Sequence, residues 1–296
     1  MQPIASWLVA RPQNAILGLA ATLMLPFAQL LSGAVMVLLV LHQGPARSAL
    51  HAVIASALLV AISLIVKSSA IQILANGLVT WLPVLLLASL LRHWRSLALT
   101  LQVSVIAAVA IMLAFYAAVP DPTAFWKSVL DEMALVFAQM ELQGQADILL
   151  TQQDVIAPQM TILVVFTSWS LYVAVLLLGY ALMQTLPGQR HCFGRFADLG
   201  LGRVLAITMA VVSLTAMASG ANWLQNIAFL LFAVFWIQGL AMAHWLHAEK
   251  RLPGVAVVLV YVLLPVLNLL MVLGLAVAGY VDAWFGFRQR VVKQNG

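Results

Sequence analysis

The chain has 296 residues, of which 64% are hydrophobic and only 8% are charged, and its mean hydropathy is +1.06. Soluble domains are close to half apolar and a quarter charged, so this composition excludes an ordinary soluble domain. The net charge of +5 comes from basic residues in short connections between apolar runs, as membrane orientation requires, which argues against a nucleic-acid-binding protein. The composition predicts a polytopic integral membrane protein.

Eight apolar segments follow one another along the chain, separated by short polar connections. They are residues 14–41, 48–66, 70–91, 97–118, 159–186, 203–219, 223–246 and 254–281. At 1.5 Å per residue the middle six are each long enough to cross the ~30 Å hydrocarbon core of a bilayer. Backbone groups in lipid must pair within their own segment, and the alternation of a membrane barrel is absent. We therefore expect an all-α transmembrane bundle.

The first and last segments are longer than a simple span and share a local pattern. Each has a proline near its middle, Pro26 or Pro265, followed three residues later by an amide, Gln29 or Asn268, and then by two leucines. Either each segment crosses once with an ordinary proline kink, or each is broken at its proline into a pair of short helices. The broken arrangement places the basic residues of both termini with the other basic loops, so we favour cytoplasmic termini.

The connections alternate in charge. Eight Lys and Arg residues fall on one side, whereas only Lys67 and Lys127 fall on the other. The positive side of a membrane protein is cytoplasmic, which orients the spans and predicts a multi-pass protein of the bacterial cytoplasmic (inner) membrane. We expect residues 1–296 to form a single integral membrane domain whose main partner is the lipid bilayer.

Residues 120–158 differ from the rest of the chain because they hold six of its nine acidic residues. Apolar residues recur there at three- and four-residue steps, which predicts an amphipathic helix on the outer surface, followed by a second, shorter helix over 148–156. This acidic extracytoplasmic insertion is either a cap packed over the bundle or a lid over an outward-facing cavity. The six acidic residues are Asp121, Asp131, Glu132, Glu141, Asp147 and Asp154.

Motifs for catalysis or metal binding are weak. His244 and His247 are spaced as metal ligands can be, but Lys250 and Arg251 beside them disfavour a dication, so we expect an interfacial role. The sequence contains neither the Gly-x-Ser-x-Gly nucleophile elbow of hydrolases nor a Walker-type nucleotide-binding loop. The single cysteine, Cys192, excludes an intrachain disulfide. We expect no catalytic residue, cofactor or metal, and therefore no enzyme.

Polar residues inside the apolar segments are better candidates, because they are costly in lipid and often functional. They are neutral amides without a buried carboxylate, which gives little support to a proton relay. Most would join helices by hydrogen bonds. We single out Gln29, Asn76 and Asn268 as candidate ligand-binding residues. We interpret Asp282 and Arg288, at the end of the last segment, as a membrane-boundary clasp, by which we mean an ion pair near one helix end.

Short motifs at both ends of the chain form a recognisable set. They are Gln238-Gly239-Leu240-Ala241, His244-Trp245, Lys250-Arg251-Leu252-Pro253, Leu273-Gly274-Leu275 and Asp282-Ala283-Trp284-Phe285-Gly286-Phe287-Arg288, with Leu31-Ser32-Gly33-Ala34-Val35 and His42-Gln43-Gly44 near the N-terminus. These motifs resemble the YybS-like family of uncharacterised bacterial membrane proteins, which carry a domain of unknown function. The resemblance covers most of the chain and is strongest at its two ends.

The family is similar in hydropathy to the substrate-binding membrane subunits of energy-coupling-factor vitamin transporters. That similarity implies a helical bundle that captures a small molecule from outside and works with a separate energising subunit, since this chain has no nucleotide site. The alternative is a non-enzymatic membrane scaffold or assembly factor that acts through its basic cytoplasmic loops and acidic outer insertion. The two hypotheses differ in whether the bundle contains a polar binding site.

Overall fold

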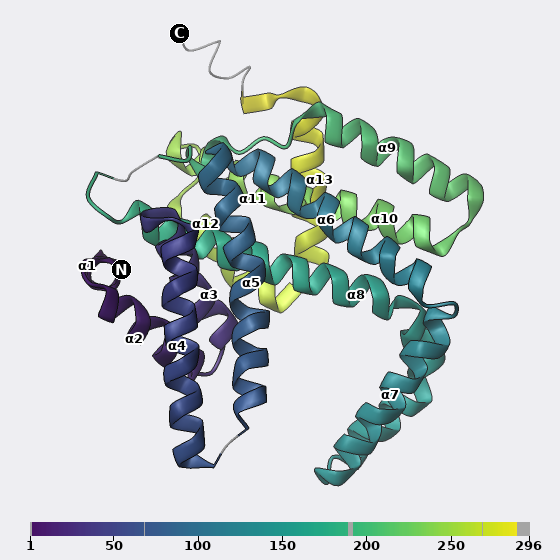
Figure 1. Ribbon diagram of the computed structural model, residues 1–296. Coiled ribbons are helices and arrows are strands. Elements are labelled where there is room, and N and C mark those ends of the chain that lie inside the picture. The colour runs from purple at the N-terminus through teal and green to yellow at the C-terminus, as the bar shows by residue number, and fades with distance from the viewer. Residues whose placement is uncertain (1, 68, 189–191, 268, 289–296) are drawn as a thin grey trace. The chain divides into compact units, whose positions relative to one another are not determined.

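The computed structural model describes residues 2–67, 69–188, 192–267 and 269–288, and over these ranges the chain is helical with no strand (Figure 1). Unless stated otherwise, the structural descriptions below refer to these residues. The helices are α1 (Gln2–Ala10), α2 (Pro12–Leu23), α3 (Ala28–Gln43), α4 (Pro45–Val66), α5 (Ala70–Trp94), α6 (Leu97–Ala118), α7 (Pro122–Gln139), α8 (Gln143–Gln184), α9 (Gly202–Ser219), α10 (Asn222–Ala233), α11 (Phe235–Ala248), α12 (Gly254–Leu267) and α13 (Leu269–Phe285), with a short 3-10 turn η1 (Phe196–Asp198).

Six helical stretches are long and apolar enough to cross a membrane: α4, α5, α6, α8, α9 and the stretch Asn222–Ala248, which comprises α10 and α11. These correspond to the middle six predicted segments, and α6 has the predicted bounds. The prediction of an all-α fold is thereby confirmed for the described residues, and the six apolar stretches are consistent with membrane spans. The finer count of eight segments stays a prediction, because α3, α12 and α13 are apolar but shorter.

The two long terminal segments differ at their prolines. The first is interrupted at Pro26, where α2 ends at Leu23 and Phe27 adopts a left-handed conformation (φ 60°) before α3 begins. In the last segment the helix continues through Pro265 to Leu267, and α13 begins at Leu269. Residue 268 between them lies outside the described residues. The two similar sequence patterns therefore produce different local structures.

The acidic insertion forms a helical hairpin of α7 and the first part of α8. The amphipathic helix is present as α7, whereas the prediction of a separate short helix over 148–156 is wrong, because α8 runs without interruption through Pro158. A proline inside a helix bends it, and Figure 1 shows α8 changing direction where it leaves the hairpin. Helix α1 was not predicted.

The chain divides into two compact units. The first comprises Met1–Val103, Ser170–Leu201 and Ala241–Val257, and it is built around α3. Residues 32–41 of α3 are all buried, and α3 packs against α1, α2, α4 and α5. A helix that is apolar on every side is stable only when it is surrounded, which is why α3 forms the centre of this unit. Helices α4 and α5 pack side by side next to it (Figure 1).

Glycines allow α8 to approach α3 closely within the first unit. A Cβ added at Gly33 would lie 2.6 Å from Val175 Cγ1, and one added at Gly179 would lie 2.8 Å from the carbonyl oxygen of Ala34. Membrane helices have no hydrophobic driving force between them, so they depend on close packing of small residues. These glycines are packing residues.

A buried hydrogen-bond relay joins three helices of the first unit. The Trp81 indole Nε1 donates to Ser32 Oγ at 2.9 Å, and that hydroxyl donates to the carbonyl oxygen of Leu19 at 3.0 Å. Trp81→Phe should lower the free energy of unfolding by about 1 kcal/mol, because a buried interhelical hydrogen bond is lost. Reversible SDS unfolding monitored by fluorescence measures this. Trp94→Phe, at a half-buried tryptophan at the end of the same helix, is the control, and an equal loss in both variants would contradict the role of the relay.

The second unit comprises Ser104–Trp169, Gly202–Leu240 and Val258–Gly296. Helix α9 packs against α10 and α13, and α10 also packs against α13. Hydrogen bonds add to this packing: Asn226 Nδ2 donates to Tyr116 Oη at 2.6 Å, and Trp169 Nε1 donates to Ser104 Oγ at 3.0 Å. The residues of the candidate site described next all belong to this unit.

Candidate functional site

The most strongly buried charge among the described residues is Asp282, in the last turn of α13. The helix continues to Phe285 and ends at Gly286, whose positive φ of 58° suits glycine at a helix C-terminus, and the Gly286 N–H donates to the Asp282 carbonyl oxygen at 2.8 Å. This turn reverses the chain, so that Arg288 reaches back to the Asp282 side chain. The sequence Asp-Ala-Trp-Phe-Gly-Phe-Arg therefore places an acid and a base together through its glycine.

Three donors converge on one carboxylate oxygen of Asp282. Arg288 Nη2 lies 2.6 Å and Arg288 Nε 3.1 Å from Oδ2, and Gln238 Nε2 donates to the same atom at 2.8 Å. The side chains of Asp282 and Arg288 are only 3% and 12% exposed. The other oxygen, Oδ1, is buried and has no hydrogen-bond partner among the described residues. We call Gln238, Asp282 and Arg288 the carboxylate cluster.

Gln238 reaches the cluster because α11 and α13 cross at unusually close range. A Cβ at Gly239 would lie 2.0 Å from the Leu275 carbonyl oxygen, and a Cβ at Gly279 would lie 2.1 Å from the Phe235 carbonyl oxygen. Neither position can hold a side chain without moving the helices apart. The Tyr280 ring packs edge-on against Phe235, with a centroid separation of 5.3 Å. The glycine crossing thus sets the distance between the amide and the carboxylate.

The opposite charges within the carboxylate cluster nearly cancel one another. A carboxylate at a helix C-terminus opposes the helix dipole, and its burial removes favourable hydration. The Arg288 guanidinium compensates both effects, so the pair is neutral overall and offers little attraction to a metal cation. A buried oxygen without a partner is costly and can be satisfied by an N–H or O–H donor. The arrangement is suited to accept a hydrogen bond from a small polar molecule.

The sequence interpretation found no carboxylate among the polar residues of the apolar segments. The predicted last segment stopped at residue 281, but α13 extends to Phe285 and buries Asp282. The burial of Asp282 was not predicted, because this residue lies just beyond the predicted segment. The expected ion pair of Asp282 with Arg288 is present, and Gln238 is an additional member that sequence reasoning did not assign to it.

Two of the three amides singled out from the sequence lie elsewhere. Gln29, near the start of α3, and Asn76, in α5, both have exposed side chains in the first unit. Asn268 lies outside the described residues, so a shared ligand for these three amides stays a prediction.

One signal in the sequence pointed to Gln238. The motifs that carry the family resemblance include Gln238-Gly239 and the run from Asp282 to Arg288, and the folded chain brings these two motifs into contact. Another amide in a span, Gln102, donates to the Leu201 carbonyl oxygen at 2.6 Å, as expected for an amide that joins chain segments. Contact with a buried carboxylate distinguishes Gln238 from that amide.

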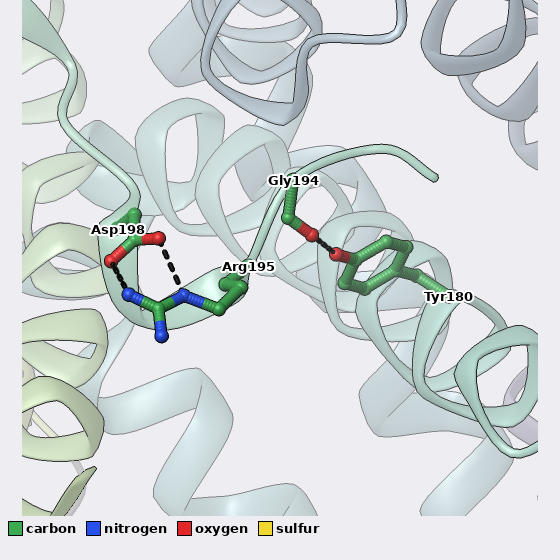
Figure 2. A network of polar contacts seen from close by, with 4 residues as sticks. All are labelled: Tyr180, Gly194, Arg195 and Asp198. Carbon is green, nitrogen blue, oxygen red and sulfur yellow. Dashed lines mark hydrogen bonds and ion pairs between the residues drawn. The ribbon is translucent and has the colours of Figure 1, made fainter. Parts of the chain in front are cut away.

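A second polar cluster occupies the loop between α8 and α9 in the first unit (Figure 2). The Tyr180 hydroxyl donates to the Gly194 carbonyl oxygen, and Arg195 contacts Asp198 through two hydrogen bonds of 2.7 and 2.9 Å. The ion pair with Asp198 raises the pKa of Arg195. Both side chains are about half exposed, so this cluster orders the loop rather than forming a buried site.

The histidines at the end of α11 have structural contacts. The His244 ring packs edge-on against Phe196, with a centroid separation of 5.4 Å, and His247 Nδ1 lies 3.0 Å from the Leu252 carbonyl oxygen. Within the described ranges, no group of three or more His, Cys, Asp or Glu side chains is arranged to hold a metal ion.

Comparison with protein-family models, curated proteins and solved structures finds no match to this chain.

Proposed function

We propose that this chain is a multi-pass protein of the bacterial cytoplasmic membrane, similar to the YybS-like family, that binds a small polar molecule as part of a transport system. Its role would be non-enzymatic and would resemble that of the substrate-binding subunits of energy-coupling-factor transporters. A separate membrane or ATPase subunit would supply the energy. The observation that carries the proposal is the carboxylate cluster, in which the buried Asp282 Oδ1 has no hydrogen-bond partner among the residues that the structure describes.

Three properties of this cluster support ligand binding. A buried ionisable group near a membrane span is costly to maintain and is a functional-site hypothesis by default. The neutral Asp282–Arg288 pair favours an uncharged or zwitterionic ligand over a metal ion. The unused acceptor, Oδ1, gives such a ligand a specific hydrogen bond in a mostly apolar setting, the usual composition of a ligand site.

A thermal-stability screen tests this proposal. Protein in nanodiscs is heated with members of a panel of vitamins, amino acids and nucleosides, because a ligand present at about one hundred times its Kd stabilises the folded state by ~2.7 kcal/mol. We expect at least one compound to raise the Tm of the wild-type protein, and Asp282→Asn to lose that shift. Asp198→Asn, which makes the same change in the exposed ion pair of the α8–α9 loop, should keep it.

Equilibrium binding of the same compound in labelled form gives a second measurement, since Asp282→Asn changes stability as well. A shift and an affinity that persist in Asp282→Asn would place the ligand elsewhere. The absence of any shift across the panel would contradict the ligand-binding proposal.

A membrane scaffold or assembly factor is the second candidate, and the hairpin of α7 and α8 favours it. This hairpin carries six exposed carboxylates and exposed apolar side chains, which are features of a surface that contacts another macromolecule. In this alternative the carboxylate cluster serves only to hold α11, α13 and the following turn together.

A further inference from the structure

The hairpin formed by residues 121–158 is held together by its own contacts. Trp126 Nε1 donates to Thr161 Oγ1 at 2.7 Å, just beyond the base of the hairpin, and Lys127 Nζ lies 2.5 Å from Asp154 Oδ1. The hydrogen bond and charge of Asp154 raise the pKa of Lys127. The side chains of Leu130 and Ala134 are buried. The face of α7 toward α8 is therefore occupied.

One flank of α7 is apolar and largely exposed, although Phe125 at its start packs edge-on against Phe115 of α6, with a centroid separation of 5.5 Å. It carries Phe125, Val129, Met133, Val136 and Met140, at steps of four, four, three and four residues, which align them along one side of a helix. We call this set the α7 stripe. Four of its members are 41–63% exposed. With Glu132 and Phe137, the middle of the stripe lines a hollow of about 300 Å³.

The charge of the hairpin indicates which kind of molecule could cover the α7 stripe. All six carboxylates of the hairpin are exposed, and its one lysine is already paired with Asp154. Helices that lie on a membrane surface carry Lys and Arg beside their apolar face, because lipid surfaces are often anionic. The hairpin has the opposite charge, which argues against lipid as the occupant.

A second copy of this chain is also a poor occupant. In the expected topology only Lys67 and Lys127 lie on the hairpin's side of the membrane, so another copy offers almost no positive charge to match the carboxylates. A different protein with basic residues beside an apolar face would complement both the apolar α7 stripe and the negative charge of the hairpin. Amphipathic helices bind in this way, and methionines such as Met133 and Met140 adapt readily to a partner's side chains.

We propose that the α7 stripe is a docking surface for a basic amphipathic helix of a partner protein on the same side of the membrane. Apolar side chains of the partner enter the hollow around Met133 and Val136, and its Lys or Arg residues face the surrounding carboxylates, of which Glu132 is the nearest to the hollow. The inference is independent of the ligand-binding proposal and names the partner class for the second candidate function.

A peptide-binding measurement tests the proposal. The probes are a labelled synthetic amphipathic helix of Leu and Lys and its counterpart with Glu in place of Lys. Each is titrated with the full chain in zwitterionic nanodiscs and with empty nanodiscs. We expect the Lys peptide to bind the protein more tightly than it binds empty discs, with an affinity that falls as salt is added. The Glu peptide should bind no better than it does to empty discs.

Two matched pairs of variants locate the binding surface. Met133→Ser lies in the stripe, whereas Leu135→Ser removes an even more exposed apolar side chain from the opposite flank of α7. Glu132→Gln removes a carboxylate at the hollow, whereas Asp131→Asn removes its neighbour on the other flank. We expect Met133→Ser to weaken binding about tenfold, Glu132→Gln to weaken it less, and both controls to bind like wild type. These exposed substitutions leave the buried face of the hairpin intact.

In-cell photo-crosslinking extends the test to the natural partner. A photoreactive residue at Val136 should give a protein adduct that Glu132→Lys abolishes, and the same probe at Leu135 should not. Equal binding of the two peptides, binding equal to empty discs, unchanged affinity in Met133→Ser, or adducts with lipid alone would each overturn the proposal. Because these positions lie on α7 and not in the carboxylate cluster, a negative result here leaves the thermal-shift test of ligand binding unaffected.

Discussion

Gly279→Ala should lower the free energy of unfolding by about 3 kcal/mol, the upper end of the usual cost of overpacking a helix contact. The added Cβ would lie 2.1 Å from the Phe235 carbonyl oxygen and 2.7 Å from the Gly239 nitrogen. Backbone atoms cannot move aside as a side chain does, so α11 and α13 must separate. Separation would also lengthen the 2.8 Å hydrogen bond between Gln238 and Asp282. Reversible SDS unfolding of the purified protein, followed by tryptophan fluorescence, measures the loss.

Gly274→Ala is the matched control on the same helix. A Cβ at Gly274 meets no atom within 4 Å, so the substitution only removes backbone freedom from the unfolded chain. It should therefore stabilise the protein by about 0.5–1 kcal/mol. Equal destabilisation in the two variants would mean that any substitution in α13 is harmful and that the close crossing with α11 has no special role.

The fold class could be predicted because bilayer thickness and backbone pairing leave few choices. An uninterrupted apolar run such as 97–118 has helical bounds that follow from composition alone. Whether a proline breaks a helix could not be predicted from composition. Pro26 lies in a break, whereas Pro158 and Pro265 lie inside helices, because neighbouring packing decides whether a freed backbone carbonyl ends a helix or only bends it.

The candidate site could be predicted only in part, because one of its three residues comes from a distant part of the chain. Asp282 and Arg288 are six residues apart with a glycine between them, so local sequence suffices to suggest their pairing. Gln238 is 44 residues away from Asp282, and it joins them through the crossing at Gly239 and Gly279. A crossing of two particular helices depends on the packing of the second unit as a whole, which periodicity and composition do not specify.

The balance inside the carboxylate cluster leads to the prediction with the largest expected effect. Arg288→Leu should lower the free energy of unfolding by about 3–5 kcal/mol, because it leaves the Asp282 carboxylate, 3% exposed, without its counter-charge. Arg195→Leu makes the same change in the ion pair with Asp198, where both side chains are about half exposed, and should cost less than about 1 kcal/mol. The same SDS unfolding assay compares the two variants directly.

A double variant distinguishes the loss of the contacts made by Arg288 from the cost of burying an uncompensated Asp282 carboxylate. If the cost of Arg288→Leu comes from an uncompensated carboxylate, adding Asp282→Asn should recover most of it, since a neutral amide keeps the size of the side chain and is far less costly to bury. Should the double variant remain as unstable as Arg288→Leu, the arginine would be stabilising the turn after α13 through its packing alone. The buried carboxylate would then have no energetic role to which a ligand could couple.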